Sequence, residues 1–496
     1  MRTILFMLVV LVAAMPLRAG VTITREKCDE LLAELPRDPW LKTRDGSALA
    51  WGEAANIHAI LDLYDATGDH RYLQKVVRRG DQMLSHRDDR RGFKDWSGKA
   101  HKAWSMAMKY TVAEGFLTDA SGRRVIRLRS TPYAYNDQTK VEVTTSEGRF
   151  SLHVANGFWK RDETFSDLSI DPESPRYFER IVNNPRTKPS CTPGKCTERS
   201  ELLSATPLAE RIGVPKSQSL TLEPIPLAYC GYVGIIYHPL LRFAEMVRAD
   251  ASLKEFAPAA QRFTHAADES YEEFRDHWRS GPGEDEGYYI CCKRGGPFVY
   301  DNIGEPFNYL GAHVSSEIAL YRLTGKLIYK DHVRRMANLF KHRLKLMPGD
   351  LYVWNYWYEP ITTGWTREDD VSDNLPELAA RVAVEDVSHA TLDIQLVLNA
   401  ARAGIVFDHT DLRRFANTFL QNVFLPDGSG FNGRVDGTGR DSRYAKAGVT
   451  GWLPLAEVDP AVYEGCRKVY VSRGRDAFRP LARLLKWEKR RGVQSR

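Results

Sequence analysis

The sequence predicts a mainly α-helical protein. We expect an α/α toroid, built as an incomplete barrel of helical hairpins, with a β-containing domain inserted into it. Apolar residues recur at helical spacing through most of the chain, in paired segments separated by a short break. Between residues 120 and 227 this pattern gives way to alternating apolar and polar residues, which is typical of strands. Helix pairs of this kind stack because a single pair cannot bury its apolar face alone. The expected organisation is a signal peptide at 1–19, the first hairpins at 20–119, the inserted domain at 120–227 and the remaining hairpins at 228–496.

Two of the hairpins are predicted from matching breaks. One runs over residues 51–84 and breaks at Thr67-Gly68; the other runs over 310–344 and breaks at Thr324-Gly325. In both, the glycine is placed to end the first helix in a left-handed conformation. Further helical segments are expected at 232–278 with a break at Asp250, at 387–424 with a break at Gly404, at 99–117 and at 476–491.

The inserted region contains three segments that alternate like strands, at 125–129, 140–143 and 149–154. A stretch rich in proline, serine and charge follows them. Because the region is too long for a plain loop, we expect a small β-containing domain, with long loops and one hairpin as the alternative. No catalytic motif occurs in it.

Composition and the first residues indicate an exported protein. The 43% hydrophobic and 27% charged residues exclude a disordered chain and a multi-span membrane protein. A net charge of +6 is small for 496 residues; it permits a local basic groove for an acidic ligand and does not indicate a nucleic-acid binder. Arg2, the apolar run from Ile4 to Ala14 and the small residue Ala19 are typical of a signal peptide. No later segment is long and apolar enough to span a membrane. We therefore expect a secreted or periplasmic protein without stable membrane insertion after cleavage.

Export also permits disulfides. Among the seven cysteines, Cys191 and Cys196 bracket a turn-forming stretch and are the best candidate pair. The odd number leaves at least one free thiol or an intermolecular bond. The adjacent Cys291 and Cys292 are expected to bond elsewhere or to stay buried.

Aromatic and imidazole side chains recur at the predicted starts of the helices that would form the inner ring. In an α/α toroid these starts converge at one rim, so we expect them to line one cleft. Aromatic faces stack on sugar rings, and helix N-termini favour anionic groups. For each residue singly, a place in the core is the ordinary alternative. The candidate substrate-binding residues are Trp51, Glu53, His238, Tyr288, Tyr309, Trp354 and Trp357.

The strongest candidates for chemistry lie in residues 354–359 and 385–393. Asp386 is placed as a helix N-cap, with His389 in the first turn and Asp393 on the same helical face. A helix N-terminus disfavours an imidazolium, so His389 is expected to be neutral and able to accept a proton. A plain cap with a loop contact is the alternative. The aromatic run at 354–359 carries polar residues between two helices, which favours a ligand platform at the surface over core packing.

Two other features give weaker hypotheses. The acidic, tyrosine-rich loop at 284–305 could bind Ca²⁺, because carboxylate oxygens abound there, but such loops are ordinarily just solvated. The predicted chemistry requires no cofactor and no metal. Residues 428–433 fit G-x-G-x-x-G, but they follow no strand and open no helix, so they do not indicate a dinucleotide site.

Repeated helix pairs with aromatic rims, together with Trp354-Asn355-Tyr356 and Glu385-Asp386-Val387-Ser388-His389, resemble the α/α-toroid carbohydrate-active enzymes. These include six-hairpin glycosidases, polysaccharide lyases and uronate C5-epimerases. The resemblance covers the helical part of the chain and is architectural, so no catalytic motif transfers residue by residue. It implies a polysaccharide substrate.

The leading hypothesis is a secreted polysaccharide lyase that cleaves an acidic, uronate-containing chain by β-elimination. The reaction needs the C6 carboxylate neutralised, the C5 proton removed and the leaving oxygen protonated. Asn308 or His313 is expected to neutralise, His389 to act as the base, and Tyr356 or Tyr358 as the acid.

Three alternatives stay open at this point. A uronate C5-epimerase would use the same scaffold. A glycoside hydrolase would need two carboxylates across the scissile bond, for which Asp386 and Glu53 are the candidates. A non-catalytic, exported glycan-binding protein would need only the aromatic rim.

Overall fold

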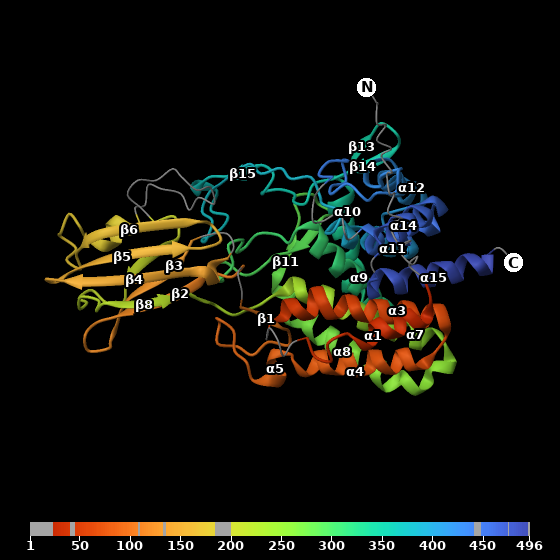
Figure 1. The fold of residues 1–496 in the computed structure, drawn as a ribbon, viewed down its shortest axis with the longest axis horizontal. Helices are drawn as coiled ribbons and strands as arrows, with labels where there is room; N and C mark the ends of the chain where they lie inside the picture. Colours follow the sequence, from red (N-terminus) through yellow and green to blue (C-terminus); the bar gives the residue numbers. More distant parts are fainter. Residues whose placement is uncertain are drawn as a thin grey trace, which may run out of the picture.

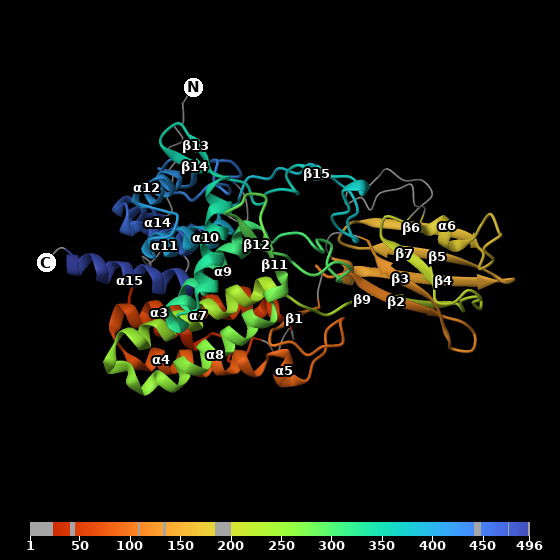
Figure 2. The same cartoon turned by 180° about the vertical axis from the view of Figure 1, so that it is seen from behind.

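The computed structural model describes residues 23–39, 45–107, 110–131, 135–183, 200–440, 448–474 and 476–494. The expected signal peptide at 1–19 and the expected Cys191–Cys196 pair lie outside these ranges. The described residues form a mainly α-helical protein that also contains small sheets. In Figure 1 the long helices lie at the right and the strands of the two larger sheets at the left; Figure 2 shows the same arrangement from behind, with the short helix α6 (Phe178–Asn183) beside the sheets.

The long helices follow one another along the chain, mostly as hairpins. Their bounds are α1 Arg25–Ala33, α3 Ala54–Thr67, α4 His70–Ser85, α7 Cys230–Ala249, α8 Ala257–Glu273, α9 Phe307–Thr324, α10 Leu327–Lys341, α11 Ala390–Arg402, α12 His409–Asn417, α14 Pro460–Arg473 and α15 Phe478–Gln494. The shorter helices are α5 Asp88–Arg91, α6 Phe178–Asn183 and α13 Gly448–Trp452. Two π-helical turns are η1 Ala48–Glu53 and η6 Thr418–Val423.

The predicted hairpin breaks are confirmed. Gly68 ends α3 at φ 68° and Gly325 ends α9 at φ 75°, both left-handed, and each amide donates back to the helix that it ends. The predicted breaks at Asp250 and Gly404 also fall between two helices. These ends are specified locally, since only glycine takes the left-handed conformation without steric cost.

Within the described residues, six helices contact one another in a closed order. α3 contacts α7, α7 contacts α9, α9 contacts α11, α11 contacts α13, α13 contacts α15, and α15 returns to α3. A second helix packs on each of them: α4, α8, α10, α12, α14 and α1, in the same order. One large apolar cluster runs through this part and includes Trp104, Trp354 and Trp452, all fully buried.

The strands between residues 113 and 224 form two antiparallel four-stranded sheets, in the orders β7-β3-β2-β9 and β6-β5-β4-β8. The predicted strands at 125–129, 140–143 and 149–154 are confirmed. Apolar side chains from both sheets meet in a second cluster, separate from that of the helices. The bounds are β2 Ala113–Thr118, β3 Arg124–Ser130, β4 Thr139–Ser146, β5 Arg149–Asn156, β6 Arg161–Leu168, β7 Leu203–Pro207, β8 Gln218–Thr221 and β9 Glu223–Pro224.

The helix predicted at 99–117 is wrong. Residues 105–106 form strand β1, which pairs with β10 (Leu227–Ala228), and Ala113–Thr118 is β2, which pairs with β3 and β9. Strand pairing overrides the helical spacing of the apolar residues: β1 pairs with residues more than a hundred positions away, and β2 pairs along most of its length with the next strand, β3. The remaining two-stranded sheets join β11 Trp278–Ser280 to β12 Gly287–Tyr289, β13 Lys345–Met347 to β14 Leu351–Val353, and β15 Gly364–Trp365 to β16 Leu378–Ala379.

Among the described residues, no helix combines the length and the apolar character that crossing a membrane would require.

Candidate functional site

A cavity of about 230 Å³ lies where the ring helices come together. Each of the six helices, or the turn just before it, contributes side chains to its wall. The lining includes Trp51 and His58 beside and on α3, His238 on α7, Ala312 on α9, Ser388, Thr391 and Gln395 at α11, Thr450 and Gly451 on α13, and Arg479 and Arg483 on α15. Such a cavity, apolar with a few convergent polar groups, is the kind of place where proteins bind small ligands.

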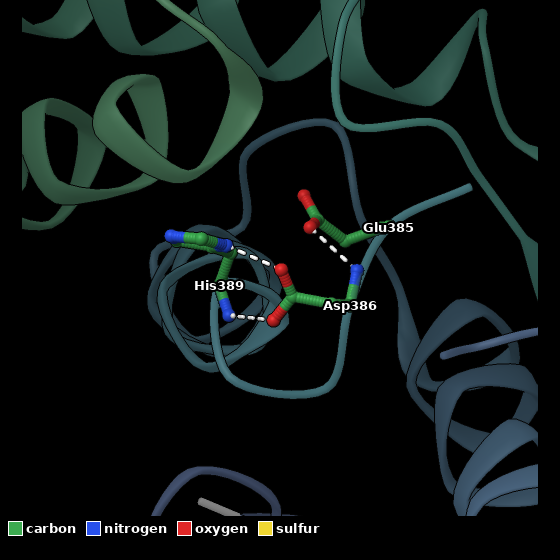
Figure 3. A group of neighbouring side chains, drawn as sticks. All are labelled: Glu385, Asp386 and His389. Atoms are coloured by element: carbon green, nitrogen blue, oxygen red, sulfur yellow. Dashed lines mark hydrogen bonds and ion pairs between the residues drawn. The ribbon is translucent and has the colours of Figure 1, made fainter. Parts of the chain in front are cut away.

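Asp386 and His389 form a hydrogen-bonded pair next to this cavity (Figure 3). The imidazole Nδ1 lies 2.5 Å from Asp386 Oδ2, while Oδ1 accepts from the backbone N–H of Ser388 at 2.9 Å and of His389 at 3.0 Å. The His389 side chain is 29% exposed and that of Asp386 14%, so a ligand can reach the ring while the carboxylate orients it. A carboxylate on Nδ1 fixes the tautomer and stabilises the imidazolium that forms on proton uptake.

The hydrogen bonds of Asp386 agree with its predicted capping role. Its Oδ1 accepts from the backbone N–H groups of Ser388 and His389, and its carbonyl accepts from that of Ala390. The regular helix α11 begins at Ala390, so His389 lies just before it. Asp386 itself stays outside the helix because it bridges to Arg434 and its N–H donates to Glu385 Oε1.

Two aromatic rings lie beside His389, and a third packs against one of them. The ring of Tyr356 lies 5.2 Å from that of His389, and the Trp51 ring 6.1 Å from it. Tyr309 stands edge-on to Trp51 at 5.6 Å. Trp51 is 39% exposed and lines the cavity, so the structure brings the predicted residues Trp51 and Tyr356 together at His389.

Two carboxyls lie buried together behind Asp386. Glu385 and Asp393 are both fully buried, and among the described residues no other group donates to Glu385 Oε2 or Asp393 Oδ1. Burial raises the pKa of Glu385 well above its ordinary value and that of Asp393 to about 7, and the two carboxyls act on one another. Since the indole N–H of Trp354 donates to Asp393 Oδ2 at 2.8 Å, Asp393 holds the charge better and Glu385 holds the proton.

Glu385, Asp386 and His389 each offer one ligand atom, and these atoms lie within 4.8 Å of one another. A cation bound through His389 Nδ1 would have to replace the hydrogen bond between that atom and Asp386, whereas binding through Nε2 would leave it in place. The three side chains form a hydrogen-bonded pair beside a buried carboxyl whose pKa is raised.

The cavity also has a basic side, which sequence reasoning missed. Arg479 and Arg483 reach it from α15, and the His58 and His238 rings face each other with centroids 4.6 Å apart. Burial, followed by the nearby Arg242 and Arg483, lowers the pKa of His238 to about 3, and burial also holds the pKa of His58 well below its ordinary value. The signal available in the sequence is the spacing of Arg479, Arg483 and Lys486, which lie on one face of a predicted helix.

Other predicted residues lie away from the cavity. Glu53 is buried and pairs with Arg79 at 2.5 Å. His313 is buried in the helical core, where its Nδ1 lies 3.0 Å from the Tyr271 hydroxyl, and burial lowers its pKa to about 3. Asn308 is fully buried, and neither atom of its amide group has a hydrogen-bond partner among the residues that the structure describes. Neither His313 nor Asn308 lines the cavity.

The prediction that the aromatic run at 354–359 forms a platform at the surface is wrong. Trp354 is fully buried, Trp357 is 8% and Tyr358 3% exposed, and Tyr288 packs against Tyr358 with ring centroids 5.7 Å apart. Only Tyr356 of this run faces His389. The run packs inward because the indole N–H of Trp354 donates to Asp393 and the Trp354 ring packs against the rings of Phe415 and Trp452.

The acidic loop is held by protein groups. Glu286 accepts from Arg343 at 2.9 Å and lies 2.7 Å from His342 Nδ1, and Asp301 accepts from Ser372 and from the backbone N–H groups of Gly295 and Asn374. These carboxylates therefore have partners in the protein, and the calcium expectation gains no support from them.

Comparison with protein-family models and with curated proteins finds no match to this chain.

Proposed function

We propose that the protein is a secreted polysaccharide lyase acting on a uronate-containing chain, built on an α/α toroid with an inserted β-sheet domain. The observation that carries the proposal is one cavity walled by all six ring helices, with the Asp386–His389 pair beside it. The contact of α15 with α3 supports a closed ring rather than an incomplete barrel.

His389 is the proposed base. With Nδ1 bonded to Asp386, the proton from C5 of the uronate would be taken by Nε2, and Asp386 would stabilise the resulting imidazolium. Trp51 and Tyr309 offer ring faces and edges on which a sugar can stack.

Tyr356 is the proposed acid. Its ring lies 5.2 Å from that of His389 and is only partly buried, so a sugar lying across the exposed edges of the two rings can meet both groups. The O–H would protonate the glycosidic oxygen as the C4–O bond breaks and a C4–C5 double bond forms. Tyr358, the other predicted acid, is buried in the core and does not serve this role in the proposal.

The hydrolase alternative loses one of its two carboxylates. Glu53 is buried and neutralised by Arg79, which leaves Asp386 without its predicted partner across a scissile bond. A C5-epimerase keeps the same proton abstraction and differs in its product.

The test is an ultraviolet scan of the purified protein with a panel of uronate polysaccharides, paired with a reducing-end assay on each sample. New absorbance from a C4–C5 double bond is expected, and it should disappear in His389→Ala. His265→Ala is the matched control, since that side chain is 76% exposed on α8. Reducing ends without the absorbance would mean hydrolysis. Inversion at C5 seen by proton NMR, with neither signal, would mean epimerisation.

A further inference from the structure

We propose that the basic side of the cavity is a binding site for a sugar carboxylate, and that Arg479 is the residue that receives it. The inference rests on the proposed function in that it names the acidic group of the same substrate. It assigns to α15 the role that the sequence had suggested for Asn308 or His313.

Among the described residues, no carboxylate lies within ion-pair distance of Arg479, and the nearby Glu53, which acts on its charge, is itself paired with Arg79. Its Nε donates to Asn56 Oδ1 at 2.9 Å, Nη2 to the Gly52 carbonyl at 2.7 Å and Nη1 to the Trp51 carbonyl at 3.4 Å. All three acceptors are neutral, and within the described parts of the chain Arg479 makes no ion pair. A guanidinium binds a carboxylate well because its parallel N–H groups match the two oxygens.

The charged side chains around Arg479 carry a net positive charge. Arg242, Arg483 and Lys486 share the two carboxylates of Asp62 and Asp65, which leaves one excess positive charge. Arg479 adds a second. These groups are largely buried, so water screens the excess charge weakly and an anion entering the cavity is stabilised.

Neutral donors complete the site. His58 and His238 face the cavity from α3 and α7, and their lowered pKa values keep them uncharged, so that each ring still offers one N–H. Gln395 adds a side-chain amide from α11. This set of donors suits the oxygens of an acidic sugar.

Trp51 connects this site to the proposed base. Its carbonyl accepts from Arg479, and its ring lies 6.1 Å from that of His389. A sugar bound over Trp51 would therefore point its carboxylate at Arg479 while its C5 proton faces His389. Neutralising the carboxylate makes that proton more acidic, as elimination requires.

The experiment is an NMR titration of the full chain with D-glucuronate, with D-glucose as the uncharged probe and acetate as the small anion. We expect glucuronate to bind more tightly than either. Arg479→Gln should weaken glucuronate binding at least about tenfold and leave glucose binding unchanged, because a hydrogen bond to a charged group is removed. Arg490→Gln, an exposed arginine on the same helix, is the control. Arg479→Lys should recover part of the affinity, because it keeps the charge.

Equal binding of glucuronate and glucose, or an Arg479→Gln protein that binds glucuronate like the parent, would overturn the inference. If Arg479→Gln does not fold, the Arg479→Lys variant provides the test. Lysine lacks the fork of N–H groups, so a glucuronate affinity equal to that of the parent would refute a guanidinium-specific site. The titration needs no turnover. Glucuronate binding without any elimination product would therefore refute the proposed function and leave this inference standing. Elimination by a protein whose glucuronate binding does not depend on Arg479 would refute this inference and leave the proposed function standing.

Discussion

Replacing Glu385 by glutamine should flatten the dependence of the protein's stability on pH. Glu385 and Asp393 are buried together, and burial raises the pKa of both carboxyls. Because the indole of Trp354 donates to Asp393, Asp393 gives up its proton first and Glu385 keeps its own to higher pH. A glutamine amide keeps the shape, keeps an oxygen for the N–H of Asp386, and donates to Asp393 without a titrating proton.

The size of the effect follows from the pKa of Asp393, which burial raises from its ordinary 3.8 to about 7. At about 1.4 kcal/mol per pKa unit, the difference is worth ~4 kcal/mol. The folded state keeps the proton that the unfolded chain releases near its ordinary pKa. The stabilisation is thus fully present below the unfolded pKa and is lost as the pH rises through about 7. In the glutamine variant Asp393 can ionise beside a permanent donor, so this loss should largely vanish.

The assay is urea-induced unfolding followed by far-ultraviolet circular dichroism, from about pH 4 to about pH 8. The free energy of unfolding of the parent should fall relative to that of Glu385→Gln by up to ~4 kcal/mol over this range. Glu284→Gln, which removes an exposed carboxylate, should run parallel to the parent. Parallel curves for parent and Glu385→Gln would refute the raised pKa values of the buried carboxyl pair as the cause of the pH dependence.

Other substitutions test the catalytic and structural assignments. Asp386→Asn should lower elimination by about 10²–10⁴-fold with the fold intact, because His389 loses the group that fixes its tautomer; an unchanged rate would remove Asp386 from the mechanism. Tyr356→Phe should lower the rate of elimination by about 10²-fold or more and leave the thermal midpoint within a few degrees of the parent, and a normal rate would exclude it as the acid. Asp62→Asn should destabilise the fold by ~3–5 kcal/mol in urea unfolding, since three buried cations lose their shared carboxylate; a loss below about 1 kcal/mol would contradict that account.

The parts of the fold that depend on local chemistry were predictable. Gly68 and Gly325 end their helices because of a conformation that glycine alone takes freely, and this is written in the sequence as Thr-Gly. Strands β3, β4 and β5 were predictable because each alternates over five or more residues. Strand β1 was not, since it pairs with residues 227–228 and no local pattern indicates so distant a pairing. Strand β2 was missed although its main partner, β3, follows it directly, because its apolar residues also fit a helical spacing.

The residues of the site likewise fall into those that local sequence predicts and those that depend on distant packing. The Asp386–His389 pair could be found because its members are three residues apart on one local turn. The burial of Trp354 could not, since it depends on Asp393 from another element. Arg479 was missed because its place in the cavity depends on α15 packing against α3, more than four hundred residues earlier in the chain.

The packing of α15 against α3 brings residues from both ends of the helical part to one short segment, the turn η1. The π-helical turn η1 precedes α3, and the ring of its residue Trp51 lies beside that of His389. Arg479 donates to the carbonyls of Trp51 and Gly52, which belong to this turn. Because these contacts are made by the backbone, Trp51→Ala should remove the stacking surface and leave Arg479 in place. The variant should therefore lose glucose and glucuronate affinity by a similar factor in the NMR titration, whereas Arg479→Gln should lose glucuronate alone. A Trp51→Ala protein that lost only glucuronate would show that the ring, and not the backbone, positions the arginine.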